Sequence, residues 1–195
     1  MRRAEIKRKT AETDIWIQMN LDGEGEARIH TGIGFLDHML HLMCRHGFLD
    51  MELKCVGDLD VDNHHTVEDI GICIGQALKA AVGDKKGMTR YATVFTPMDE
   101  ALSMISLDFG GRPYLYFDVP FEREYVGNLE TELFEEFFRA LVNHSGLTLH
   151  IELQRGKNAH HIAESIFKGF GRAVHQATAI QDRIKGVLST KGSLE

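Results

Sequence analysis

The chain has few of the residues that mark disulfide scaffolds and flexible linkers. Among 195 residues it has three cysteines and three prolines. Cys44, Cys55 and Cys73 form an odd set in mostly apolar surroundings, without the close pairing of a metal site, which is typical of reduced structural thiols. Proline is scarce, and no low-complexity linker appears in the chain.

Long apolar runs and an excess of basic charge are also missing. No apolar stretch is long enough to span a bilayer, and the residues after Met1 show no signal-peptide core. A formal net charge of −7 argues against nucleic acid or an anionic membrane as the main partner. We therefore expect a cytoplasmic globular protein of one or two domains, in which a few local cations hold any phosphate group.

Histidine is abundant, with 11 residues, and four of them lie in a repeated motif. Asp62–Glu68 and Asn158–Glu164 both contain His-His-x-x-Glu. On a helix, residues three and four apart share a face, whereas neighbours point about 100° apart. Each glutamate can therefore join one histidine of its pair at an ion, and each pair is predicted to serve two different ions. A donor set of imidazole and carboxylate indicates a first-row divalent metal. The alternative is that the motif residues are polar residues at helix starts that form hydrogen bonds only with solvent or backbone.

The repeat extends beyond the motif. Strand-like segments occur in register at Thr10–Gly25 and Thr96–Gly111. In each half an amphipathic helix, a short strand and the helix that the motif opens follow. These segments are Phe35–Arg45, Met51–Val56 and a helix ending near Val82 in the first half, and Leu133–Asn143, Leu147–Leu153 and a helix ending near Thr178 in the second.

This order predicts an α+β fold built by internal duplication of a β-β-β-α-β-α unit. Half-covered units of this kind bury their apolar faces by packing together, so we expect one compact duplicated domain with two sheets flanking a four-helix layer. The predicted repeats are residues 1–86 and 87–180, with Gly83–Gly87 as the hinge between them. The tail, residues 181–195, has no counterpart in the first half and is a candidate for an added function.

Two further residues complete the predicted metal ligands. His38 lies on the first amphipathic helix, at the position that aligns with Glu136 in the second repeat. His41, one turn away from His38, could be a neighbour that binds no metal. With His38 and Glu136, the motif donors suffice for two ions with four protein ligands each. Octahedral ions would then keep open positions, which is typical of a catalytic site.

Several cations and one carboxylate are candidates for binding a substrate. Arg90 and Arg112 flank strands of the second half, and Lys168 lies on the same helix face as the motif glutamate. Most such residues are solvated or paired, but arginine suits bidentate phosphate binding. Ser189–Gly192, with its hydroxyls, cation and glycine, has the composition of an anion-binding loop. Glu12 lies in the turn between the first two strands.

With these residues assembled, the chain resembles the imidazoleglycerol-phosphate dehydratases of histidine biosynthesis over nearly its whole length. The segments that carry the resemblance are GFLDHMLHLMCRHG, DVDNHHTVEDIG, PMDEAL, DFGGRPYL, GKNAHHIAESIFKGFGRA and STKG. The resemblance implies repeated halves similar to domain 2 of ribosomal protein S5. It also implies two manganese ions per site, and a homo-oligomer of 24 subunits with the sites at subunit boundaries.

Position by position, the resemblance implies these metal ligands: His38, His64, His65, Glu68, His160, His161 and Glu164. An eighth ligand position falls on Glu136, where several family members have histidine, so that glutamate either ligates in its place or has another use. The implied substrate contacts are Glu12, His38, His46, Arg90, Arg112, Lys168, Thr190 and Lys191. The residues expected to take part in catalysis are Glu12, His64, His65, His160 and His161.

The implied reaction removes water from imidazole glycerol phosphate to give imidazole acetol phosphate. It requires loss of the hydroxyl beside the ring and of a proton from the next carbon. Divalent ions on the ring nitrogens would act as Lewis acids and as a template, and Glu12 is our hypothesis for the base. Two other classes stay open at this point. A binuclear hydrolase could use the same histidine and glutamate ligands. A metal-buffering protein could also use the paired histidines, but that function would not explain the candidate phosphate-binding arginines and lysines.

Overall fold

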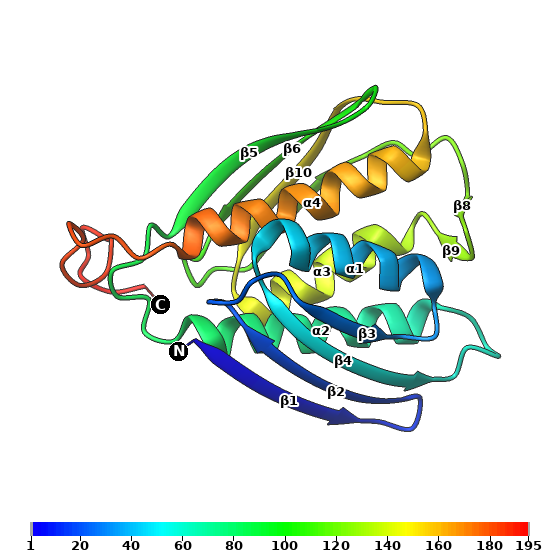
Figure 1. The fold of residues 1–195 in the computed structure, drawn as a ribbon, viewed down its shortest axis with the longest axis horizontal. Coiled ribbons are helices and arrows are strands. Elements are labelled where there is room, and N and C mark those ends of the chain that lie inside the picture. Colours follow the sequence, from blue (N-terminus) through cyan, green and yellow to red (C-terminus); the bar gives the residue numbers. More distant parts are fainter. Residues whose placement is uncertain (1, 195) are drawn as a thin grey trace.

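The structure, a computed structural model, describes residues 2–194 and consists of two four-stranded sheets with four helices between them (Figure 1). The first sheet has the order β1 (Arg3–Lys9), β2 (Thr13–Asn20), β4 (Asp50–Gly57), β3 (Ala27–His30). The second has the order β5 (Tyr91–Met98), β6 (Ala101–Asp108), β10 (Thr148–Arg155), β7 (Tyr114–Asp118). The helices are α1 (Gly34–Gly47), α2 (His64–Val82), α3 (Leu133–Ser145) and α4 (Ala159–Thr178).

The two sheets have the same topology, which confirms the predicted duplication. In each, the first two strands of the half form an antiparallel hairpin, and the fourth strand pairs between the second and the third. The fourth strand runs parallel to the third and antiparallel to the second, in β4 and in β10 alike. The chain therefore repeats a β-β-β-α-β-α unit, with the predicted sheet, helix and sheet layers.

The register of the repeat differs from the sequence alignment by two residues. Asn20 of β2 lies opposite the first residue of β4, and Asp108 of β6 lies opposite the first residue of β10. Asn20 and Asp108 are therefore equivalent, whereas the alignment of Thr10–Gly25 with Thr96–Gly111 is two positions out. Successive side chains of a strand alternate between its faces, so a slip of two leaves the hydrophobic pattern unchanged. The pattern alone could not detect it.

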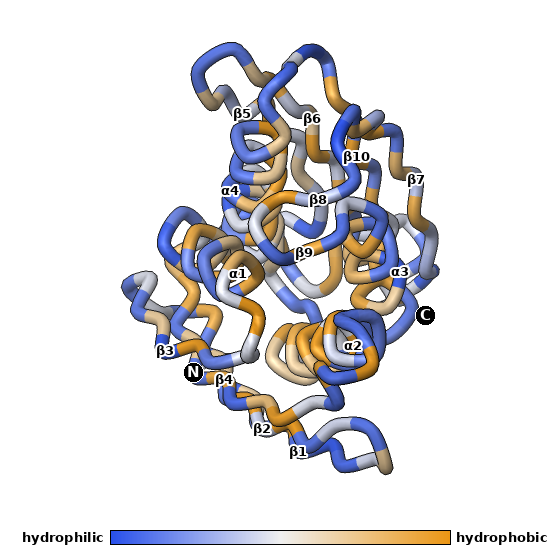
Figure 2. Tube along the Cα trace, turned by 90° about the vertical axis from the view of Figure 1, so that its right-hand side faces the viewer, coloured by the Kyte–Doolittle hydropathy of each residue, from blue (hydrophilic) through white to orange (hydrophobic). Residues whose placement is uncertain are grey.

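The helix layer joins the two halves. Helix α1 packs against α4, and α2 packs against α3, so each pair combines one helix from each repeat. Helix α2 also covers β1 and β2, and α4 covers β5 and β6. Figure 2, which looks at one end of the layer, shows the two pairs side by side between the sheets.

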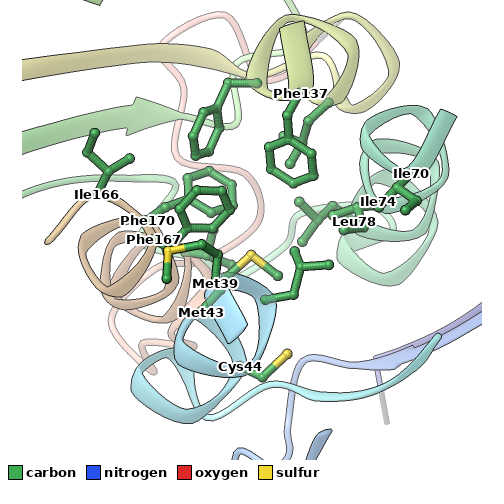
Figure 3. Packing of buried hydrophobic residues seen from close by; sticks show 14 of the residues in the cluster. Met39, Met43, Cys44, Ile70, Ile74, Leu78, Phe137, Ile166, Phe167 and Phe170 are labelled. Atoms are coloured by element: carbon green, nitrogen blue, oxygen red, sulfur yellow. The ribbon is translucent and has the colours of Figure 1, made fainter. Parts of the chain in front are cut away.

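The centre of this layer is a continuous apolar core (Figure 3). Its side chains have almost no exposed surface and come from all four helices; they include Met39, Met43, Ile70, Ile74, Phe137, Phe167 and Phe170. Full burial of one such side chain contributes about 1.5–3 kcal/mol relative to its exposure. The halves are thus held together by the apolar residues that the three- and four-residue spacing selects.

Two equivalent glycines let the helices of each pair approach closely. A Cβ atom at Gly171 of α4 would fall on the carbonyl oxygen of Met43 in α1. A Cβ atom at Gly75 of α2 would fall on the carbonyl oxygen of Leu141 in α3. Both contacts join backbone to backbone, so no side-chain rearrangement can relieve a clash. The positions of α1 on α4 and of α2 on α3 depend on these residues.

A short hairpin in the second half was not predicted. Strands β8 (Tyr125–Val126) and β9 (Leu129–Glu130) pair between β7 and α3. The side-chain nitrogen of Asn63, just before α2, donates to the carbonyl oxygen of Asn128 and to Oε2 of Glu130, both at 2.8 Å. The hairpin therefore fastens the start of a first-half helix to the second half.

The tail lies against the hinge. Residues 181–194 contain no helix or strand, and Gln181 and Gly186 exchange backbone hydrogen bonds with Gly87. Cys44, Cys55 and Cys73 are free thiols, and burial raises the pKa of each. No helix within residues 2–194 is long and apolar enough to cross a membrane.

Alanine at the contact glycines is expected to destabilise the fold. Gly171→Ala and Gly75→Ala should each lower the free energy of unfolding by about 1–3 kcal/mol, because the added methyl group overpacks a backbone contact. Gly34→Ala is the control, because a Cβ there meets no described atom within 4 Å. Denaturant unfolding measures the three changes. Equal stability of all three variants would contradict the packing account.

Candidate metal centre and substrate cleft

All four helices begin at the same end of the molecule, on the right in Figure 1. The two His-His-x-x-Glu motifs open α2 and α4, and the first turns of α1 and α3 carry His38 and Glu136. The motif helices begin in the same way. Asp62 and Asn158 accept the backbone N–H of the first histidine of each motif, at 2.8 and 2.9 Å. The fold therefore gathers the predicted metal ligands at one end.

Three of these ligands converge. Oε1 of Glu164 lies 3.0 Å from Nε2 of His160 and 3.2 Å from Nε2 of His38. One donor atom from each of the three residues lies within 4.8 Å of the others, the spacing of a shared ion. Glu164 is 8% exposed, and both imidazoles are partly accessible. The cluster thus combines a first-half residue with a second-half motif.

The charge of Glu164 is maintained by its neighbours. Burial raises the pKa of this carboxyl, but hydrogen bonds from Lys168, His38 and His160 outweigh burial and bring the pKa to about 2. Lys168 lies one turn further along α4 and donates its Nζ to Oε2 of Glu164. Lys168, predicted to contact substrate, therefore lies beside the metal cluster.

The repeat equivalents of these three residues do not converge. Among residues 2–194, no second group of three metal-type donors comes together. Glu136 lies 3.8 Å from Nε of Arg139, its neighbour on α3. His64 and Glu68 are half-buried at the start of α2. These three predicted ligands are thus not brought to one point within a single chain.

The second histidine of each motif turns to a different carboxylate. Nδ1 of His65 lies 2.9 Å from Asp58, and Nδ1 of His161 lies 2.8 Å from Oε2 of Glu100. Glu12 lies near His65, with 3.8 Å between Oε1 and Nε2. The hydrogen bond that His65 donates to Asp58 raises the pKa of His65, and the one that His161 donates to Glu100 raises the pKa of His161.

Sequence reasoning missed Glu100. Its Oε1 also accepts the backbone N–H groups of Lys157 and Asn158, at 3.2 and 2.8 Å. The hydrogen bond from His161 is the main reason that its pKa falls to about 2. With the register corrected by two residues, Glu100 is the repeat equivalent of Glu12, so a correct alignment of the hairpins was the signal that could have found it.

The predicted phosphate contacts lie elsewhere. Arg90, Arg112, Thr190 and Lys191 line one cleft of about 860 Å³, formed with the tail. Arg90 forms two hydrogen bonds with Asp108, at 2.7 and 2.8 Å, and one with the carbonyl oxygen of Leu188, at 2.9 Å. The tail is therefore part of this cleft, as its lack of a repeat counterpart suggested.

The cleft and the metal cluster lie at opposite ends of α4. The backbone N–H of Arg90 bonds to Ala177 in the last turn, whereas His160 is in the first. A helix rises about 1.5 Å per residue, which puts the two ends about 25 Å apart. His46 lies near the end of α1, on the same side of the molecule as the cleft, and lines a cavity with Arg172. Burial and the positive charge of Lys168 lower the pKa of His46.

The donor set of the cluster fits a divalent cation. A buried, ionised carboxylate with two imidazole nitrogens on rigid helix starts matches the ligand preferences of first-row metals. Partial exposure of both imidazoles leaves access for another ligand. The fold and this donor set define the class of protein, a duplicated α+β enzyme with a candidate metal centre.

Known proteins identify the family. The family profile of imidazoleglycerol-phosphate dehydratase matches residues 31–174. The enzyme of that name from Alkaliphilus metalliredigens is 60% identical and covers 96% of each chain, and that from Acetivibrio thermocellus is 55% identical and covers 99% of each. The crystal structure of the Staphylococcus aureus dehydratase aligns with a TM-score of 0.84 at 43% identity, covering 92% of this chain and 99% of that one. The chain belongs to the imidazoleglycerol-phosphate dehydratase family.

Loss of His38 is expected to weaken metal binding. His38→Ala removes one of three converging donors and should reduce affinity for Mn²⁺ at least about tenfold, since even outer-sphere partners of a metal contribute that much. His41→Ala is the control, because Nδ1 of His41 bonds to the carbonyl oxygen of Asp37 on its own helix. Metal content after dialysis measures both. Equal metal content in the two variants would remove His38 from the site.

Proposed function

We propose that this chain catalyses the elimination of water from imidazole glycerol phosphate, in histidine biosynthesis, as a metal-dependent hydro-lyase. Membership of the family supports the reaction. The observation that carries the proposal is the convergence of His38, His160 and Glu164 on one point from two repeats. A metal buffer would not need the separate cationic cleft at the tail.

Divalent ions, for which we propose two Mn²⁺ per site, would be held by the histidines and glutamates of the helix starts. When bound, they would supply Lewis acidity to the imidazole ring of the substrate. Glu164 would be the anionic ligand of one ion, because it is already ionised and buried between its two imidazoles. The motif of α2 and Glu136 would contribute to the other ion.

Side chains of the protein would carry out proton removal and phosphate binding. The proton on the carbon beyond the departing hydroxyl must be removed, and we assign this step to Glu12. It is an exposed carboxylate in the β1–β2 turn, next to a motif histidine. Arg90 and Arg112 would bind the phosphate group, since guanidinium groups match phosphate geometry. Thr190 and Lys191 of the tail would complete that pocket.

The distance between the two ends implies that more than one chain builds each active site. About 25 Å separates the metal cluster from the phosphate cleft along α4, and a small substrate cannot span it. We therefore propose a homo-oligomer in which one chain supplies the metal ligands and another the phosphate contacts. The three free thiols support a reducing compartment, the cytoplasm.

Metal removal should abolish turnover. Purified protein is expected to convert imidazole glycerol phosphate to imidazole acetol phosphate, to lose this activity after chelation and to regain it with Mn²⁺. The reason is that a deprotonated imidazole ring supplies the electron density that expels the hydroxyl, and bound divalent ions would favour that deprotonation. A product assay before and after chelation, together with metal analysis, measures this. Full turnover by metal-free protein would refute the proposed mechanism.

Mixed oligomers test whether sites are shared. Arg112→Ala and His160→Ala should each be inactive alone, because each removes one end of every site. Co-expressed in equal amounts, they should recover about a quarter of wild-type activity, since a random assembly unites an intact cleft with an intact metal cluster at that frequency. Differently tagged chains confirm the mixing. Inactive mixed oligomers would show that each chain builds its own site.

A further inference from the structure

Both repeats place a carboxylate at the same ring nitrogen of the second motif histidine. Nδ1 of His65 faces Asp58 at 2.9 Å, and Nδ1 of His161 faces Glu100 at 2.8 Å. A carboxylate at neutral pH only accepts hydrogen bonds, so Nδ1 must be the donor in both rings. Nε2 is then the nitrogen left for an ion. In each ring the nearest ion-pairing carboxylate oxygen lies 3.8 Å from Nε2, beyond hydrogen-bonding distance.

The two carboxylates come from different places. Asp58 belongs to the loop between β4 and α2. The loop before α4 consists of Gly156–Asn158 and contains no acidic residue. Glu100 reaches His161 from the β5–β6 turn instead. Its other oxygen accepts two backbone N–H groups of that loop, which fixes the carboxylate relative to α4.

The repeat equivalent of Glu100 is Glu12, and its contacts differ. Asp58 already holds Nδ1 of His65, so Glu12 is left exposed in its turn, 3.8 Å from Nε2. Equivalent turn residues therefore have different surroundings in the two halves. The carboxylate of Glu100 accepts hydrogen bonds on both oxygens, whereas that of Glu12 accepts none within residues 2–194, which leaves it free to act as a base.

We propose that Glu100 is a positioning residue that holds His161 with Nε2 presented to a divalent ion, and that it replaces in the second repeat the aspartate that orients His65 in the first. The inference rests on the proposed metal dependence. It assigns separate roles to two equivalent glutamates, orientation of a ligand to Glu100 and proton removal to Glu12.

The test compares Mn²⁺ affinity among three variants by competition with a chelator. Glu100→Ala should weaken Mn²⁺ binding about 10- to 100-fold, the usual cost of losing a carboxylate behind a metal-binding histidine. Glu12→Gln should keep wild-type affinity while kcat falls. Asp99→Asn is the matched control. It removes a charge from the same turn, 3.8 Å from Nε2 of His161, but leaves the Nδ1 hydrogen bond intact.

A second measurement separates positioning from simple stabilisation of the loop. The melting temperature of each variant is recorded without metal and with saturating Mn²⁺. A positioning role predicts a smaller rise on adding metal to Glu100→Ala, whereas a purely structural role lowers both temperatures equally. Wild-type affinity in Glu100→Ala, or equal losses in Asp99→Asn, would overturn this inference alone. A wild-type protein that binds no Mn²⁺ would overturn the proposed function as well.

Discussion

The backbone contact between α1 and α4 determines where the candidate metal centre lies. Gly171 has no side chain to separate the helices, so α4 rests directly on the carbonyl oxygen of Met43. The two helices belong to different repeats and begin at the same end. Their first two turns therefore meet, and His38 of one reaches Glu164 of the other. The metal cluster is a consequence of how the repeats pack.

The duplication also explains why the molecule has two functional ends. At one end, the starts of the helices carry the histidines and carboxylates of the motifs. At the other end, the last turn of α4 lies beside Arg90 and the tail. Only the second repeat carries such a tail, so the cationic cleft has no partner in the first. Under the proposed function, the imidazole ring of the substrate would bind at one end and its phosphate at the other. In one chain these are about 25 Å apart, and the proposed oligomer would bring them together.

Much of this arrangement could be predicted from the sequence. His160 and Glu164 share a helix face because they are four residues apart, and the repeat identified His38 through its counterpart Glu136. Glu100 was missed, because a two-residue slip of hairpin register leaves strand alternation unchanged. The β8–β9 hairpin, with two residues per strand, has no periodicity to detect. The placement of the cleft depends on packing over the length of α4, which local patterns do not record.

The most direct test of the central claim is a crystal structure of the protein grown with Mn²⁺, with the ions located from anomalous scattering at the manganese edge. The account predicts a manganese ion bound directly by His38, His160 and Glu164. It also predicts that Arg112 or Lys191 of another copy lies across the same site. Manganese bound elsewhere, with these three residues still hydrogen-bonded to one another and no ion between them, would contradict it.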